Sequence, residues 1–275
     1  IDGVDAFVGP LLKATATEFA ALTAAAPQPR LVLNYLDELN AKPVPGGPFQ
    51  FGIAIEDEAA SLVTHMAAAD LENVLVVHGP ARWAQRAFTT LQSNWAQSLV
   101  SAGFTDAREL TQAVGQAMQV SASEDRKRAL ANVLGEDLEF LPRARRDIDA
   151  VVALTSQLES QALIPALRFH FADNLPVYST SQALRGEQRD QMRNFKATEM
   201  PLLQVSRADY EDVVQALRVR EGSYAELYAL GFDAYALATW LPLLQRDSNL
   251  NISAASGQLW LESGGRFRRH LDLTD

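Results

Sequence analysis

The sequence predicts an α/β fold in which mostly parallel sheets are flanked by helices. Along most of the 275 residues, short apolar segments alternate with segments of helical periodicity. The short apolar segments lack a polar side chain at every second position, which is typical of strands covered on both faces in a parallel sheet. Strands and helices that alternate with right-handed crossovers build a doubly wound sheet. A chain of this length also tends to divide into lobes.

The expected elements follow from apolar runs, helical spacing and turn residues. Strands are expected at 4–8, 31–36, 49–55, 73–77, 149–154 and 176–178, with a further one near 108–110. Helices are expected at 14–25, 56–69, 81–102, 123–134, 157–171 and 224–244. In the third helix, Phe88, Leu91, Trp95 and Leu99 form one apolar stripe. Residues 183–197 are expected to be a loop or short helix, 199–203 a short extended piece, and 258–261 with 266–271 a hairpin around Gly264-Gly265.

The charge and composition of the chain argue against some classes of binding partner and binding site. The net charge is −10, from 34 acidic and 24 basic residues, which argues against a nucleic-acid or anionic-membrane partner. The densest basic stretch, 143–146, is short and reads as a solvated loop. There is no cysteine, which excludes disulfides and thiolate zinc sites.

The sequence was searched for a membrane-spanning helix and for a signal peptide at its start. The sequence contains no run of 18 or more apolar residues, so it predicts no membrane-spanning helix. The first five residues lack the basic and apolar regions of a signal peptide. We expect a targeting signal, if there is one, upstream of Ile1.

Motifs that would indicate a cofactor or catalysis are missing from the sequence. Neither a G-x-G-x-x-G motif nor a Walker loop is present, so we expect no nucleotide cofactor, and neither G-x-S-x-G nor S-x-x-K is present. The four histidines are scattered, so we expect no metal site. Asp147 and Asp149 are either paired carboxylates or residues that flank a strand beside Arg145 and Arg146, and we favour the second. We therefore expect a protein that is not an enzyme.

The order of elements, with the final hairpin, resembles a type I periplasmic binding protein of the branched-chain amino-acid receptor kind. The resemblance implies one lobe of about 1–70 and 184–246 and a second of about 71–183 and 247–275. A ligand cleft would lie between the lobes at the carboxyl ends of the strands, as is general for open α/β sheets.

Five sequence blocks, spread over nearly the whole chain, carry a closer resemblance. They are VDAFVGPLLK at 4–13, FG at 51–52 followed by EDEA at 56–59, RRDIDAV at 145–151, LPVYSTS at 175–181 and LYALGFDA at 227–234. They resemble the LpoA or LppC lipoprotein family of penicillin-binding protein activators, in the C-terminal domain of that family. The resemblance implies a domain that begins with a further β-α-β segment, so we expect the first lobe to lack this segment here.

The same resemblance implies a function and a location. Family members are outer-membrane lipoproteins that face the periplasm, with a lipid anchor and a helical-repeat domain upstream. They bind a bifunctional class A penicillin-binding protein and stimulate its peptidoglycan transpeptidation. A non-catalytic activator is therefore the first hypothesis, and peptidoglycan fragments are further candidate ligands. The alternative is a periplasmic protein that binds a solute, either amino-acid-like or a cell-wall fragment.

Five residues are candidates for the cleft. Lys13 and Asn34 fall near the ligand loops of the receptors, Trp83 falls where those receptors place an aromatic ring, and Ser156 and Ser181 follow strands. Each has an alternative. Lys13 either pairs with an anion or lies along the lobe surface, and Asn34 either meets a ligand or turns its own backbone. Trp83 either closes over a ligand or belongs to the core, and the two serines are also common in loops.

Overall fold

The chain folds into two compact units. The computed structural model describes residues 4–36, 47–135, 145–185, 189–192, 194–198, 212, 215, 225–244, 246 and 250–274. Unit 1 is Ile1–Asp57 with Glu199–Asp272, and unit 2 is Glu58–Thr198 with Leu273–Asp275. The expected lobes, 1–70 with 184–246 and 71–183 with 247–275, divide the chain differently. In particular, the C-terminal hairpin lies in unit 1.

Unit 1 contains two three-stranded sheets. The first is parallel, in the order β1-β2-β3, and consists of β1 (Phe7–Val8), β2 (Arg30–Val32) and β3 (Phe49–Gln50). The second is antiparallel, in the order β11-β10-β9, and consists of β9 (Asn251–Ala254), β10 (Gly257–Leu261) and β11 (Phe267–His270). The two sheets meet where the Gln50 N–H donates to the Gly265 carbonyl at 2.8 Å. Gly265 takes a φ of 75°, which suits glycine in this hairpin turn.

Within the described ranges, unit 1 includes the helices α1 (Lys13–Leu22) and α8 (Ala225–Leu244). One face of α8 places Leu230, Leu237 and Leu241 in a buried core with Phe51 and Leu259. By length and composition α8 is also the one described helix that is long and apolar enough to cross a membrane. Because its inner face packs in the core of unit 1, we interpret α8 as a core helix.

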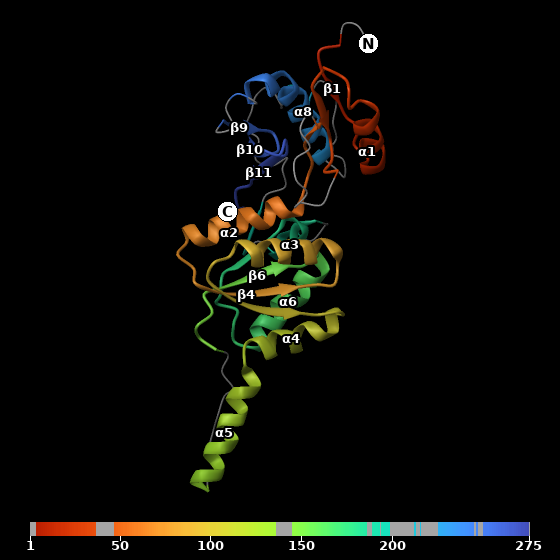
Figure 1. The fold of residues 1–275 in the computed structure, drawn as a ribbon. Coiled ribbons are helices and arrows are strands. Elements are labelled where there is room, and N and C mark those ends of the chain that lie inside the picture. The colour runs from red at the N-terminus through yellow and green to blue at the C-terminus, as the bar shows by residue number, and fades with distance from the viewer. Residues whose placement is uncertain are drawn as a thin grey trace. The chain divides into compact units, whose positions relative to one another are not determined.

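Unit 2 is built on a five-stranded parallel sheet in the order β5-β4-β6-β7-β8, which confirms the expected α/β class (Figure 1). Its strands are β4 (Asn73–His78), β5 (Ser98–Gly103), β6 (Ala150–Leu154), β7 (Val177–Ser179) and β8 (Phe195–Ala197). All five residues of the central strand β6 are buried, as expected for a strand covered on both faces.

Helices cover both faces of this sheet. Those that cover it are α3 (Arg82–Asn94), α4 (Leu110–Ala117) and α6 (Gln157–Phe169). Unit 2 also contains α5 (Val120–Leu134) and the short 3-10 helices η1 (Ala107–Glu109), η2 (Ser181–Leu184) and η3 (Arg189–Met192). Figure 1 shows α3 on one face, α4 and α6 on the other, and α5 standing away from the sheet. The helix α2 (Ile55–Ala68) begins in unit 1 and continues in unit 2.

The structure corrects two expected elements. The helix expected at 81–102 ends at Asn94, and Leu99 of its expected stripe lies on β5. Six parallel pairs with β4 hold this strand, so sheet pairing overrides the local helical spacing. The strand expected near 108–110 is the 3-10 helix η1, because Asp106 accepts the Arg108 N–H at 2.8 Å and caps a helical turn.

Two further segments differ from the expectation in part. The loop or short helix expected at 183–197 contains η3 but ends in β8, and β9 was not expected. The extended piece expected at 199–203 lies outside the described residues.

Candidate functional site

The carboxyl edge of the unit 2 sheet brings together two of the five candidate cleft residues. Ser156 follows β6 and Ser181 follows β7, and these strands are parallel neighbours. Carboxyl ends of parallel strands are where α/β folds usually bind ligands. The chemistry of this edge therefore depends on whether the two hydroxyl groups are available.

Ser156 is used by the helix that follows it. Its N–H and its Oγ both donate to Oε2 of Glu159, at 2.7 and 2.8 Å, which caps the N-terminus of α6. The Glu159 carboxylate also lies over the turn after β4, since a Cβ at Gly79 would be 2.7 Å from its Oε1. A Cβ at residue 79 would push the end of this side chain aside, so glycine leaves room for the carboxylate here.

Ser181 is bound by a second acid of the same unit. Its N–H donates to Oε2 of Glu58 at 2.7 Å and its Oγ donates to Oε1 at 2.9 Å. Thr198 Oγ1 also donates to Oε2, at 2.7 Å. Burial raises the pKa of Glu58, while these three donors and the charge of Arg185 act to lower it.

The Ser181 and Glu58 side chains do not form an accessible nucleophile and base. Both are buried, and Ser181 is only 1% exposed. A nucleophile must reach its substrate, and this hydroxyl is enclosed by its own unit. The pair therefore stabilises the end of β7.

The other three candidates are placed in separate parts of the fold. Lys13 is exposed at the first position of α1, and Trp83 is partly exposed in the first turn of α3. Asn34 follows β2, where its Nδ2 donates to the Leu11 carbonyl at 2.8 Å and its Oδ1 accepts the Tyr35 N–H at 2.9 Å. Both ends of the Asn34 amide thus bond backbone atoms of unit 1. Lys13 and Asn34 belong to unit 1 and the other three to unit 2, so the five-residue cleft stays a prediction.

Unit 1 contains a buried charge cluster that the sequence did not predict. Asp57 is 1% exposed and its Oδ1 lies 3.2 Å from Nη1 of Arg268, whose Nε lies 3.3 Å from Oε1 of Glu262. Arg269 is also buried, with its guanidinium 5.3 Å from the centre of the Phe51 ring. In the sequence, Asp57 is one of three consecutive acids at the start of a helix, where acids are usually solvated.

Burial controls ionisation in this cluster. It raises the pKa of Asp57 to about 7, although Arg268 and Arg269 act to lower it. Burial also raises the pKa of Tyr35, whose hydroxyl donates to the Phe267 carbonyl at 2.7 Å. The cluster is thus a structural network inside unit 1 whose charge state depends on pH.

With this geometry established, comparison with known proteins places the chain in a family. The model of the family described as "LppC putative lipoprotein" matches residues 1–275. The chain belongs to the LppC lipoprotein family. The family resemblance seen in the five sequence blocks is confirmed.

Curated relatives match nearly the whole of this LppC chain. The "Penicillin-binding protein activator LpoA" of Vibrio cholerae is 24% identical over 283 residues, which cover 99% of this chain and 46% of the relative. The protein of the same name from Photobacterium profundum is 22% identical and covers 98% of this chain and 45% of its own length. The chain therefore spans about half the length of the curated relatives it matches.

Solved structures show the same fold. Full-length LpoA from Haemophilus influenzae superposes with a TM-score of 0.71 at 19% identity, covering 99% of this chain and 47% of that one. The LpoA (YraM) C-domain of the same organism, described as a regulator of PBP1A, gives 0.69 at 19% identity, with 98% and 78% covered. A putative branched-chain amino acid ABC transporter protein from Chromobacterium violaceum gives 0.71 at 23% identity, with 99% and 80% covered. The expected likeness to periplasmic binding proteins is confirmed at the level of fold.

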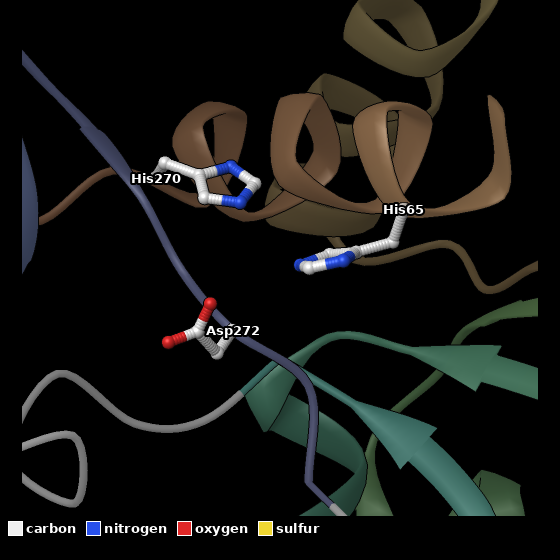
Figure 2. Close-up of side chains that lie close together, drawn as sticks. All are labelled: His65, His270 and Asp272. Carbon is white, nitrogen blue, oxygen red and sulfur yellow. The ribbon is translucent and has the colours of Figure 1, made fainter. Parts of the chain in front are cut away.

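Possible metal ligands of the LppC chain are drawn in Figure 2. His65 lies on α2 in unit 2, whereas His270 ends β11 and Asp272 follows it in unit 1. Over the described ranges, neither unit alone brings together three histidine or carboxylate atoms that could hold an ion. These residues therefore support no metal site within one unit.

Proposed function

We propose that this chain is a non-catalytic domain of an outer-membrane lipoprotein that faces the periplasm. In this proposal it binds a bifunctional class A penicillin-binding protein and stimulates its peptidoglycan transpeptidation. The observation that carries the proposal is the family match over all 275 residues, together with relatives named penicillin-binding protein activators. The H. influenzae C-domain described as a regulator of PBP1A has the same fold.

The polar contacts at the sheet edge of unit 2 argue against a small solute bound by Ser156 and Ser181. The two serines that follow β6 and β7 are bonded to Glu159 and Glu58 of the chain itself. A solute at these hydroxyls would have to compete with the Glu159 and Glu58 carboxyl groups that already bond them. At the edge of the sheet, the hydroxyl groups of these two serines therefore already have hydrogen-bond acceptors within the chain.

Co-purification with a class A penicillin-binding protein tests the proposal directly. The chain and the longer polypeptide that contains it are each mixed with the purified synthase, and peptide crosslinking of a lipid-linked substrate is measured. We expect the longer polypeptide to bind and to increase crosslinking, since activation is a coupling free energy of ~1–3 kcal/mol. If the longer polypeptide neither binds the synthase nor changes crosslinking, the proposed function is wrong.

Solute binding is the second candidate because proteins of the branched-chain amino acid transporter kind share the fold. A ligand bound to the native state would raise the melting temperature. Thermal unfolding across amino acids, peptides and muropeptides therefore separates the candidates. We expect no shift with free amino acids, and tight binding of a common amino acid in calorimetry would favour the receptor instead.

A further inference from the structure

Unit 2 has three connections to the rest of the chain, and the described contacts bring them together. The unit starts at Glu58 on α2, its main stretch ends at Thr198 after β8, and the chain returns at Leu273. The Thr198 hydroxyl donates to Glu58, and the backbone of Thr198 forms an antiparallel bridge with Leu273. Residues far apart in the sequence thus share one cluster inside this unit.

The carboxylate of Glu58 is the shared acceptor of this cluster. It takes three hydrogen bonds of 2.7 to 2.9 Å, two from Ser181 and one from Thr198, and the Ser181 N–H also reaches Thr198 Oγ1 at 3.1 Å. All three residues are buried, with exposed fractions of 4% or less. Hydrogen bonds shielded from water in the protein interior are electrostatically stronger than those exposed to it.

The C-terminal connection is held to the same place by Thr274. Its N–H donates to the Ala197 carbonyl at 2.7 Å, and its Oγ1 accepts the Ala197 N–H at 3.0 Å. The same hydroxyl donates to the Phe195 carbonyl at 3.2 Å. Thr274 is therefore held on β8, the strand whose end is fixed by Glu58 through Thr198.

We propose that Glu58 is a latch whose carboxylate holds the three chain connections of unit 2 in one arrangement, so that they are ordered or released together. The physical reason is that Glu58 lies on the first connection and is bonded to the second, which in turn pairs with the third. Loss of this acceptor would leave the buried hydroxyls of Ser181 and Thr198 without the acceptor that they share here, and the Ser181 N–H with Thr198 Oγ1 alone, which is costly. Glu58 acts here as a positioning residue.

Hydrogen exchange of the backbone amides in the intact chain tests the latch. In Glu58→Ala we expect the amides of Ser181, Thr198 and Thr274 to exchange about tenfold faster or more, because each is held by the cluster. Amides in the centre of β4 and β6 should keep their protection. Glu58→Gln should keep the slow exchange, because its amide oxygen still accepts from Thr198 and its amide nitrogen can donate to Ser181 Oγ.

Glu159→Ala is the matched control, since it removes an acid from the same edge of the sheet that bonds Ser156 instead. It should leave exchange at Thr198 and Thr274 unchanged. The latch is wrong if Glu58→Ala leaves those two amides at the wild-type rate, or if Glu159→Ala accelerates them equally. Should Glu58→Ala fail to fold, Thr198→Val removes only the hydroxyl between the connections. Faster exchange at Thr274 then supports the latch, and an unchanged rate overturns it.

Discussion

Single buried side chains set the pH response of this protein. Asp57 is the clearest case, since burial raises its pKa from 3.8 to about 7. The folded chain therefore binds this proton more tightly than the unfolded chain, and stability falls as the pH rises from about 4 to about 7. By this shift alone the loss is on the order of 4 kcal/mol at most. We expect Asp57→Asn to reduce the difference in unfolding free energy between pH 5 and pH 8.

Asp147→Asn is the control for this prediction because its shift has the opposite sign. A hydrogen bond from Arg145 lowers the pKa of Asp147 to about 2, so its contribution is present above the unfolded value of 3.8 and is lost as the pH falls toward 2. The control should leave the difference between pH 5 and pH 8 unchanged in denaturant unfolding. Equal pH dependence in wild type and Asp57→Asn would show that Asp57 is already ionised at pH 5.

At the residue scale, the sequence placed Ser156 and Ser181 directly after strands, as the structure has them, but did not indicate their partners. Ser156 and Ser181 follow strands, and this was readable from the pattern. The S-x-x-E spacing from Ser156 to Glu159 is a capping signature that could have been read as well. Glu58 and Asp57 could not be found in this way, because consecutive acids at a helix start look solvated. Their partners lie up to 211 residues away, as in the Asp57–Arg268 ion pair.

At the scale of the element, we expect opposite changes in the unfolding free energy when two helical glycines are replaced by alanine. In α4, a Cβ at Gly115 would be 2.6 Å from Cε1 of His170, whose Nε2 lies 2.8 Å from the Thr111 carbonyl oxygen. Gly115→Ala would push the buried ring away, and we expect the unfolding free energy to fall by about 1–3 kcal/mol. In α8, a Cβ at Gly231 would meet nothing within 4 Å. Gly231→Ala should raise the stability by about 0.5–1 kcal/mol.

Denaturant unfolding of the two alanine variants checks this pair. Both replace glycine by alanine inside a helix, so helix propensity alone would make both stabilising. A stabilised Gly115→Ala variant would therefore mean that the His170 ring moves without cost.

The capped start of α6 gives a third prediction for an element. Ser156→Ala removes one hydrogen bond to Glu159 and should lower the unfolding free energy by about 1 kcal/mol. Exposed Ser93 lies near the end of α3 and bonds the Thr89 carbonyl, so Ser93→Ala serves as the control and should change stability by less than about 0.5 kcal/mol. An equal effect of the two substitutions would argue against the cap.

At the scale of the whole molecule, the sequence predicted the class of fold better than the division of the chain. Apolar strands without alternation predicted the parallel sheet of unit 2. A strand that is buried on both faces has apolar residues at successive positions, which is visible within the strand itself. The expected second lobe included the segment 247–275, which up to Asp272 belongs to unit 1. Its membership in unit 1 depends on the packing of Leu259 and Phe267 against Phe51 and α8, contacts between distant residues that leave no local pattern.

Each unit has an apolar core of its own, which leads to a prediction for unfolding of the intact chain. The core of unit 1 includes Phe51 and Leu237, and that of unit 2 includes Leu75 and Leu163. The two described cores share no residue, so we expect two transitions in scanning calorimetry.

The same glycine variants assign these transitions. Gly115→Ala should lower only the transition of unit 2, and Gly231→Ala should raise only that of unit 1. For units of this size, 1 kcal/mol corresponds to a shift of roughly 2–8 °C, which calorimetry resolves. A single transition that both variants move would mean that unfolding is cooperative through the three connections of unit 2. In that case Glu58→Ala, which removes the shared acceptor of those connections, should split it into two.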